Sequence, residues 1–280
     1  MQLVYLYAVK FLQWPITLFG LLALVVLLLN SLLAHAGQNI KVYVYHNQPP
    51  FVLQNGDQIQ AGLSVTLVEQ LNLLYWPEYL FKPEIRPRMR LNHELQPWID
   101  AQCPNSQTKC DDNWIVLWVT PQWGWGADAE SRYLWVDFFQ DHDYLISAQQ
   151  KPIDVWSAEN MQGKIFASLR GHVYPPEINQ FFDSGVMLRA DSDNELTLLQ
   201  RIHRGRADLS LMQLSTLNYL FQHNHELSLI KNELHIANEP LKSFMLQAMI
   251  PAGRQDLKDA LEQLKSQQTW IASLKEFGIQ

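Results

Sequence analysis

The sequence predicts an α/β fold, because segments typical of strands alternate with segments typical of helices along the chain after residue 37. A second set of strands and helices begins near Lys164, and no Pro-, Gly- or Ser-rich linker separates it from the first. There is no internal repeat and no low-complexity stretch. These observations predict two lobes that share crossover strands rather than two domains joined in tandem.

In the first half, β-branched and aromatic runs predict strands, and leucines at helical spacing predict helices. The run Trp114–Val119 is continuously apolar, as in a strand buried on both faces. Pro49-Pro50 ends the first strand, because proline cannot donate to a ladder. The predicted strands are Ile40–Tyr45, Leu80–Ile85, Trp114–Val119, Tyr133–Phe139 and Tyr144–Gln150, and the predicted helices are Ser64–Tyr75 and Leu91–Ala101.

The second half repeats the alternation. Leu196, Leu199 and Ile202 share one face of a predicted helix, which is the pattern of a helix packed on a core. The predicted strands are Lys164–Leu169, Val186–Ala190, Leu209–Met212 and Phe244–Ile250, and the predicted helices are Pro175–Phe182, Asn194–His203, a helix ending at Phe221, Asp256–Leu264 and Trp270–Phe277.

The N-terminus predicts export from the cytoplasm. Residues Ile16–Leu33 are almost wholly apolar, Lys10 precedes them, and Ala34-His35-Ala36 fits the small-x-small rule for signal peptidase. We interpret residues 1–36 as a signal peptide. An uncleaved anchor is the alternative, since a run of this length can span a bilayer. The expected location is therefore the periplasm, either free or anchored to the inner membrane.

The part after the signal is acidic, with 20 basic and 28 acidic residues. This balance argues against nucleic acid as a partner, because phosphate binding needs clustered lysine and arginine. We expect a monomer.

The two cysteines, Cys103 and Cys110, stand in a short segment of an exported chain. In an oxidising compartment this predicts a local disulfide. A metal site is the alternative, but Cys-x₆-Cys lacks zinc spacing and no histidine is close in sequence. The other histidines are scattered, so we expect no metal and no cofactor.

Several phrases, in order, resemble one family. These are Lys-Val-Tyr-Val-Tyr-His-Asn-Gln-Pro-Pro-Phe (41–51), Gly-Leu-Ser-Val-Thr-Leu-Val-Glu-Gln-Leu (62–71), Glu-Ser-Arg-Tyr-Leu-Trp-Val-Asp-Phe-Phe (130–139), Gln-Gly-Lys-Ile-Phe-Ala-Ser-Leu-Arg-Gly (162–171), His-Arg-Gly-Arg-Ala-Asp-Leu (203–209) and the ending 270–278. Together they resemble the bacterial extracellular solute-binding protein family 3, the periplasmic amino-acid-binding type, over most of residues 39–279.

The resemblance implies a two-lobed periplasmic-binding-protein-like (type II) α/β fold with hinge strands and a central ligand cleft. Lobe 1 would comprise residues 38–140 and 245–280, and lobe 2 residues 145–238. It also implies capture of a small polar or anionic, amino-acid-like solute for an ABC importer permease or a membrane sensor. Hinge closure is the expected motion.

The resemblance also implies site residues. Arg132 matches the arginine that binds a ligand carboxylate, and its planar guanidinium suits that task. The turn Gly171-His172-Val173-Tyr174 precedes a helix N-terminus, where backbone N–H groups can bind an anion. An ordinary surface arginine and an ordinary strand–helix turn are the alternatives.

Aromatic residues are expected near the cleft, where they could stack on a ligand. Phe51, Trp118 and Trp123 are the candidates, with Trp125 beside them, although Trp118 also fits a core position.

The chain departs from the family at Gln213, where members that bind α-amino acids carry a carboxylate for the ammonium group. An amide cannot neutralise a buried cation, which puts a standard amino acid in doubt as the ligand. Gln213 nonetheless remains a candidate ligand-binding residue.

No Gly-x-Ser-x-Gly, His-Glu-x-x-His or phosphate-binding glycine loop is present, so we do not expect an enzyme. Two alternatives stay open: a binding module that contacts a protein partner through exposed Trp123 and Trp125, and a dehydratase-type enzyme on the same fold.

Overall fold

The structure is a computed structural model that describes residues 37–55, 58–103, 110–172 and 174–279. The predicted signal or anchor, residues 1–36, lies outside the described residues, as does Val173. Within the described ranges, no helix is both long enough and apolar enough to cross a membrane.

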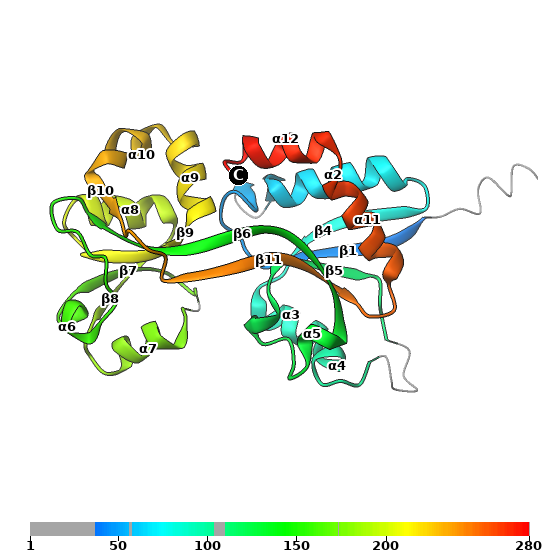
Figure 1. The fold of residues 1–280 in the computed structure, drawn as a ribbon, viewed down its shortest axis with the longest axis horizontal. Helices are drawn as coiled ribbons and strands as arrows, with labels where there is room; N and C mark the ends of the chain where they lie inside the picture. Colours follow the sequence, from blue (N-terminus) through cyan, green and yellow to red (C-terminus); the bar gives the residue numbers. More distant parts are fainter. Residues whose placement is uncertain (1–36, 56–57, 104–109, 173, 280) are drawn as a thin grey trace, which may run out of the picture.

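The chain alternates strands and helices as predicted (Figure 1). The strands are β1 (Gln38–Val44), β2 (Leu53–Asn55), β3 (Gln58–Ala61), β4 (Tyr79–Ile85), β5 (Trp114–Val119), β6 (Tyr133–Ala148), β7 (Ile165–Leu169), β8 (Leu188–Ser192), β9 (Leu209–Gln213), β10 (Leu234–Ile236) and β11 (Lys242–Pro251).

Most helices also lie close to their predicted positions. The α-helices are α2 (Leu63–Tyr75), α3 (Arg88–Glu94), α4 (Gln96–Ile99), α5 (Ala129–Arg132), α6 (Ala158–Met161), α7 (Pro176–Asp183), α8 (Glu195–His203), α9 (Leu214–His223), α10 (His225–Ile230), α11 (Gln255–Lys265) and α12 (Gln268–Glu276), and two short 3-10 helices are η1 (Pro121–Trp123) and η2 (Lys231–Glu233).

A nine-stranded sheet runs through the molecule in the order β4-β1-β5-β11-β6-β9-β7-β8, with β10 also paired to β6. The outer strands are parallel, whereas β11 and β6 are antiparallel to each other and to their neighbours β5 and β9. In Figure 1 these two long strands form a ribbon across the middle of the molecule, with a lobe at each end.

The two lobes have separate hydrophobic cores. In lobe 1, two clusters of buried side chains lie on the two faces of β1, β5 and β11, and their buried members fall within residues 40–139 and 246–279. In lobe 2, two further clusters draw their buried members from residues 145–237. No one of these four clusters combines described residues of both lobes. Each lobe is therefore a separately packed unit, as a hinge requires.

Two predicted elements were wrong in extent. Tyr133–Phe139 and Tyr144–Gln150 are one strand, β6, because residues 140–143 continue the ladder to residues 242–245 of β11. These residues carry polar side chains because they bridge the lobes instead of packing in a core. The predicted helix Leu91–Ala101 is two helices that meet at Leu95, because Pro97 has no N–H to donate to the carbonyl of His93 and its ring disfavours continuing the first helix past that point, whereas proline is tolerated in the first turn of the second helix.

The hairpin of β2 and β3 was not predicted. Its strands pair antiparallel with Asn55 opposite Gln58, on either side of Gly56-Asp57, two residues outside the described ranges. A Gly-Asp pair between strand-forming residues is a hairpin signal, so this hairpin could have been predicted from the sequence.

The predicted disulfide is present. Cys103 and Cys110 are bonded, and their Cα atoms lie 6.2 Å apart. Cys103 is buried in the lobe 1 core beside Trp98 and Trp114. The bond joins α4 to the approach of β5 and stabilises this edge of lobe 1.

We expect the double variant Cys103→Ser, Cys110→Ser to lower the free energy of unfolding by about 2–3 kcal/mol, because an eight-residue loop is no longer closed in the unfolded chain. Urea unfolding measures the change. As a control, dithiothreitol should destabilise the wild type and leave the double variant unaffected. Two free thiols in the intact mass of protein purified from the periplasm would contradict the prediction.

Candidate functional site at the junction of the lobes

The two lobes meet through polar groups beside the ribbon. Gln48, in the loop after β1, donates from Nε2 to Oε1 of Gln213 at the end of β9, at 2.9 Å. Thr216 of α9 donates from Oγ1 to the carbonyl of Pro49 at 2.7 Å. On the same side, the ring of Tyr219 stacks on Phe277 near the end of α12. The sequence-predicted Gln213 thus lies at the junction and bonds across it.

Trp123 lies at this junction. Its half-buried ring lies 5.5 Å from the imidazole of His46, 6.3 Å from the ring of Tyr45 and 5.3 Å from the ring of Phe244 on β11. Phe51 is fully buried behind His46, at 5.6 Å. We call these five side chains the aromatic wall.

His46 is the most unusual polar group of the wall. Its side chain is 7% exposed, its Nδ1 lies 3.4 Å from Gln48 Nε2, and its Nε2 has no hydrogen-bond partner. Burial lowers the pKa of His46 to about 3, and His172 of lobe 2 adds to this effect; the Trp118 backbone and Gln48 oppose it. The imidazole is therefore neutral at physiological pH, with one nitrogen unsatisfied.

Two carboxylates of β6 lie on one face at the junction. Asp141 is buried and accepts hydrogen bonds from Ser215 Oγ at 2.6 Å, Ser215 N at 3.2 Å and His142 N at 2.8 Å. Asp143, two residues on, is opposite Gln213 on β9 and Lys242 on β11. Burial and the charge of Asp141 raise the pKa of Asp143 to about 7, although Lys242 opposes this.

The predicted turn after β7 lies in lobe 2. Gly171 has φ 76°, the left-handed conformation that glycine tolerates, and His172 is exposed to solvent. The pKa of His172 is nevertheless lowered by surrounding protein and by Arg189. Tyr174 is buried, and its hydroxyl accepts a hydrogen bond from Leu169 N at 2.9 Å. Within this turn, His172 is the residue whose charge lowers the pKa of His46. Tyr174 instead holds the turn together through its hydrogen bond with Leu169.

The hydrogen bonds and the ion pair of Arg132 lie within lobe 1. Its guanidinium donates to the carbonyls of Ile99 at 2.6 Å and Trp98 at 3.2 Å, and lies 3.6 Å from a carboxylate oxygen of Asp128. The side chain is 12% exposed. These contacts join α5 to α4, so the structure does not bring Arg132 to the junction. Binding of a ligand carboxylate by Arg132 stays a prediction.

Two of the predicted aromatic residues are core residues. Trp118 is fully buried, donates from Nε1 to Ser64 Oγ at 2.8 Å, and has φ 60°. Such backbone strain persists where the surroundings hold the residue in place. Trp125 is also fully buried, with the Arg88 guanidinium 3.6 Å above its ring. The expectation that Trp125 is exposed for a protein partner is therefore wrong.

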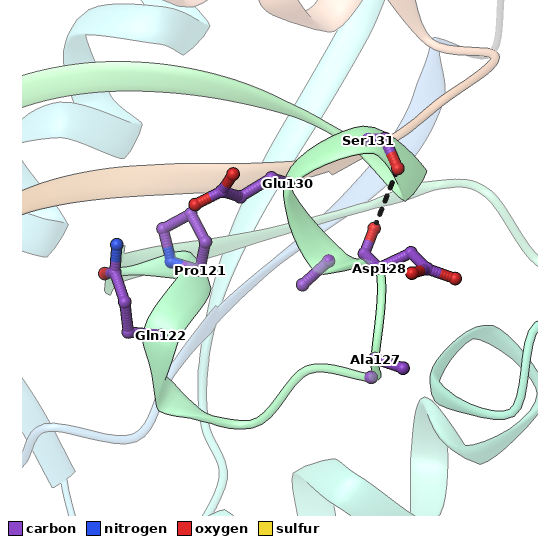
Figure 2. A pocket seen from close by; sticks show the side chains of 8 residues that line it. Pro121, Gln122, Ala127, Asp128, Glu130 and Ser131 are labelled. Atoms are coloured by element: carbon purple, nitrogen blue, oxygen red, sulfur yellow. Dashed lines mark hydrogen bonds between the residues drawn. The ribbon is translucent and has the colours of Figure 1, made fainter.

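The loop that follows η1 encloses a hollow of about 360 Å³ (Figure 2). Its labelled side chains include Asp128 and Glu130, and Ser131 Oγ donates to the carbonyl of Asp128 at 3.2 Å. A second hollow, of about 410 Å³, lies beside the disulfide and includes Lys41 and Trp114. Both are lined by lobe 1 residues alone. Among the described residues, no three or more His, Cys, Asp or Glu side chains are grouped to hold a metal ion.

The sequence did not single out His46, Gln48 or Asp143 as site residues. His46 and Gln48 follow the first strand, a usual place for binding groups in α/β folds. Asp143 lies in residues 140–143, the polar stretch between the two predicted strands. Polar residues between two apolar strand segments were the signal that could have indicated a site there.

No family model and no curated protein matches this chain. Solved structures with the same fold do. The GluR0 ligand-binding core from Nostoc punctiforme in complex with L-glutamate has a TM-score of 0.54 at 14% identity, covering 85% of this chain and 98% of its own. An ancestral arginine-binding protein bound to arginine has a TM-score of 0.53 at 15% identity, covering 87% and 99%.

A third similar structure concerns glutathione import through GshT and the cystine ABC importer of Streptococcus mutans, with a TM-score of 0.54 at 10% identity and coverage of 86% and 91%. At these identities the likeness shows the fold. The chain is a two-lobed α/β protein of the periplasmic-binding-protein type, which confirms the predicted fold class. The family resemblance is supported at the level of that fold.

We expect Arg132→Ala to lower the free energy of unfolding by about 1.5–3 kcal/mol, because the carbonyls of Trp98 and Ile99 lose a charged donor. Thermal or urea unfolding measures this. Arg170→Ala is the control, since that side chain is 67% exposed and its pair with Asp193 should contribute little. Unchanged stability with weakened ligand binding would instead support a carboxylate-binding Arg132.

Proposed function

We propose that this protein is an exported solute-binding protein whose lobes hold a small polar solute between them. The observation that carries the proposal is the junction itself. Two separately packed lobes are joined by a two-stranded ribbon, Gln48 of one lobe donates a hydrogen bond to Gln213 of the other, and the charge of His172 in lobe 2 lowers the pKa of His46 in lobe 1. Polar groups from both lobes, beside an aromatic wall, form the kind of site in which ligands bind.

Export is supported by two features. The apolar segment Ile16–Leu33 with its Ala-His-Ala site is typical of a signal peptide. The Cys103–Cys110 disulfide is typical of an oxidising compartment, since cytosolic thiols stay reduced. We propose a periplasmic location, with delivery of the solute to an ABC importer permease or to a membrane sensor.

Two observations favour binding over catalysis: the low pKa of His46 and the kind of proteins found among the structural neighbours. His46 is a weak base, because its pKa is about 3, and its Nδ1 faces an amide rather than a nucleophile. The named proteins among the structural neighbours are a ligand-binding core and an arginine-binding protein. We therefore assign the site to recognition of a solute that leaves unchanged.

We expect Trp123→Ala to weaken solute binding at least tenfold, because its ring is the half-buried face of the aromatic wall. Isothermal titration calorimetry with a solute found by a thermal-shift screen measures the affinity. A ligand at 100 times its dissociation constant should stabilise the fold by about 2.7 kcal/mol.

Trp76→Ala is the matched control, since Trp76 is 64% exposed just after α2. It should leave the affinity within about a factor of two of the wild type. If Trp123→Ala binds as tightly as Trp76→Ala, the solute does not bind at the junction. A screen of amino acids, amines, dicarboxylates and small peptides without any hit would contradict the proposed function.

A further inference from the structure

The junction between the lobes is unusual in its charges, because the Asp143 carboxylate forms no ion pair there, while the lysine opposite it, Lys242, pairs with Glu177. Asp143 is half-buried, and its side chain makes no hydrogen bond or ion pair with any residue in the described part of the chain. We propose that the junction binds a small organic cation, a diamine or a quaternary ammonium compound, whose charged nitrogen is held by the Asp143 carboxylate. This rests on the proposed function and names its solute class.

The position of Asp143 follows from the register of the ribbon. Residues directly opposite in an antiparallel pair project on the same face, so Asp143 shares its face with Gln213 and Lys242. The side chain of Gln213 reaches Gln48 of lobe 1. Asp143 therefore lies beside the groups through which the lobes meet. It supplies, from the neighbouring strand, a carboxylate next to the amide of Gln213.

The two nearby cations, Lys242 and Arg88, already have partners, but only Lys242 is in an ion pair with a described residue. Lys242 Nζ lies 2.6 Å from a carboxylate oxygen of Glu177, in the first turn of α7. Arg88 stacks on Trp125 and donates at 2.7 Å to the carbonyl of Trp123, so its hydrogen-bonding groups are directed into lobe 1, although its charge has no carboxylate partner among the described residues. At Lys242, an anionic solute would have to break the pair with Glu177, and Glu177 places a negative charge at the helix end that would otherwise attract an anion.

The aromatic wall also favours a positively charged solute. Tyr45, Trp123 and Phe244 present rings at the junction, and the negative face of an aromatic ring attracts an ammonium group. A carboxylate together with aromatic rings is a combination that holds alkylammonium ions, because it offers both charge and an apolar surface for their methylene or methyl groups.

A second, independent observation points to a ligand. His46 Nε2 is buried without a partner, which is costly unless something satisfies it. Gln48 lies beside His46 and donates to Gln213, and Gln213 is opposite Asp143 on the neighbouring strand, so His46 and Asp143 lie at the same junction without a hydrogen-bonded link between them. A solute whose ammonium lies at Asp143 and whose far end carries a hydrogen-bonding group would satisfy both.

The pH dependence of cation binding follows from the pKa of Asp143. Burial raises the pKa of Asp143 to about 7, and the charge of Asp141 on β6 adds to this effect, whereas Lys242 on β11 lowers the pKa. Glu177 on α7 pairs with Lys242, and Gln213 on β9 does not titrate. A cation favours the ionised carboxyl. Affinity for the cation should therefore rise as pH rises from 6 to 8 and level off above 8.

The same pKa gives a test that needs no ligand. Because the folded pKa lies above that of the unfolded chain, the folded state holds more protons between about pH 4 and 7, so the contribution of Asp143 to stability falls as pH rises through that window. Asp143→Asn should therefore have a higher Tm than the wild type at pH 8, and a smaller or no advantage at pH 4. This result also establishes that the variant folds.

The decisive experiment is isothermal titration calorimetry of the wild type, Asp143→Asn and Asp137→Asn at pH 8 with putrescine, choline chloride and L-glutamate. Asp137 is an exposed carboxylate on the same strand and provides the matched control. We expect one of the two cations to bind the wild type, to bind Asp143→Asn at least tenfold more weakly, and to bind Asp137→Asn within a factor of two of the wild type.

Equal affinities of the wild type and Asp143→Asn for the cation would overturn the inference. So would binding of L-glutamate, sensitive to Trp123→Ala, with neither cation bound; in that case the proposed solute-binding function stands. If no compound in the screen binds, the proposed function fails and the inference fails with it.

Discussion

The ladder between β6 and β11 is the constraint on which the architecture depends. Its backbone pairing runs from Tyr133 opposite Pro251 to Asp143 opposite Lys242. Because main-chain hydrogen bonds hold it, the side chains between the two cores are free to be polar. The middle of the ribbon can therefore carry Asp141 and Asp143 where a packed core would demand apolar residues. The separation of the lobes and the chemistry of their junction have this single origin.

Much of the fold could be predicted because periodicity reports burial. Trp114–Val119 is apolar throughout, and β5 has those bounds. The same logic failed at residues 140–143, where polarity suggested a break although the ladder continues. The site was less predictable. Arg132 follows a motif, but what its guanidinium contacts depends on α4, and neither sequence distance nor residue type reveals that contact.

The junction combines groups that cost stability. A desolvated carboxylate at Asp143 and an unsatisfied nitrogen at His46 are both unfavourable, and Trp118 in the adjoining lobe 1 core adds backbone strain. Folding domains usually avoid such groups unless function maintains them. The lobe cores, largely apolar and separately packed, provide the stability that allows this concentration of unfavourable features.

The contacts between the lobes are unequal on the two sides of the ribbon. On the α9 side, Thr216 bonds to Pro49 and Tyr219 stacks on Phe277, whereas α7 and α3 lie on the other side, each on its own lobe (Figure 1). Rotation about the contacted side would change the α7–α3 separation far more than the α9–α12 separation. Binding of a solute at the junction would then change the distance between α7 and α3 on the outer surface. A docking protein or a pair of fluorescent dyes could detect that change.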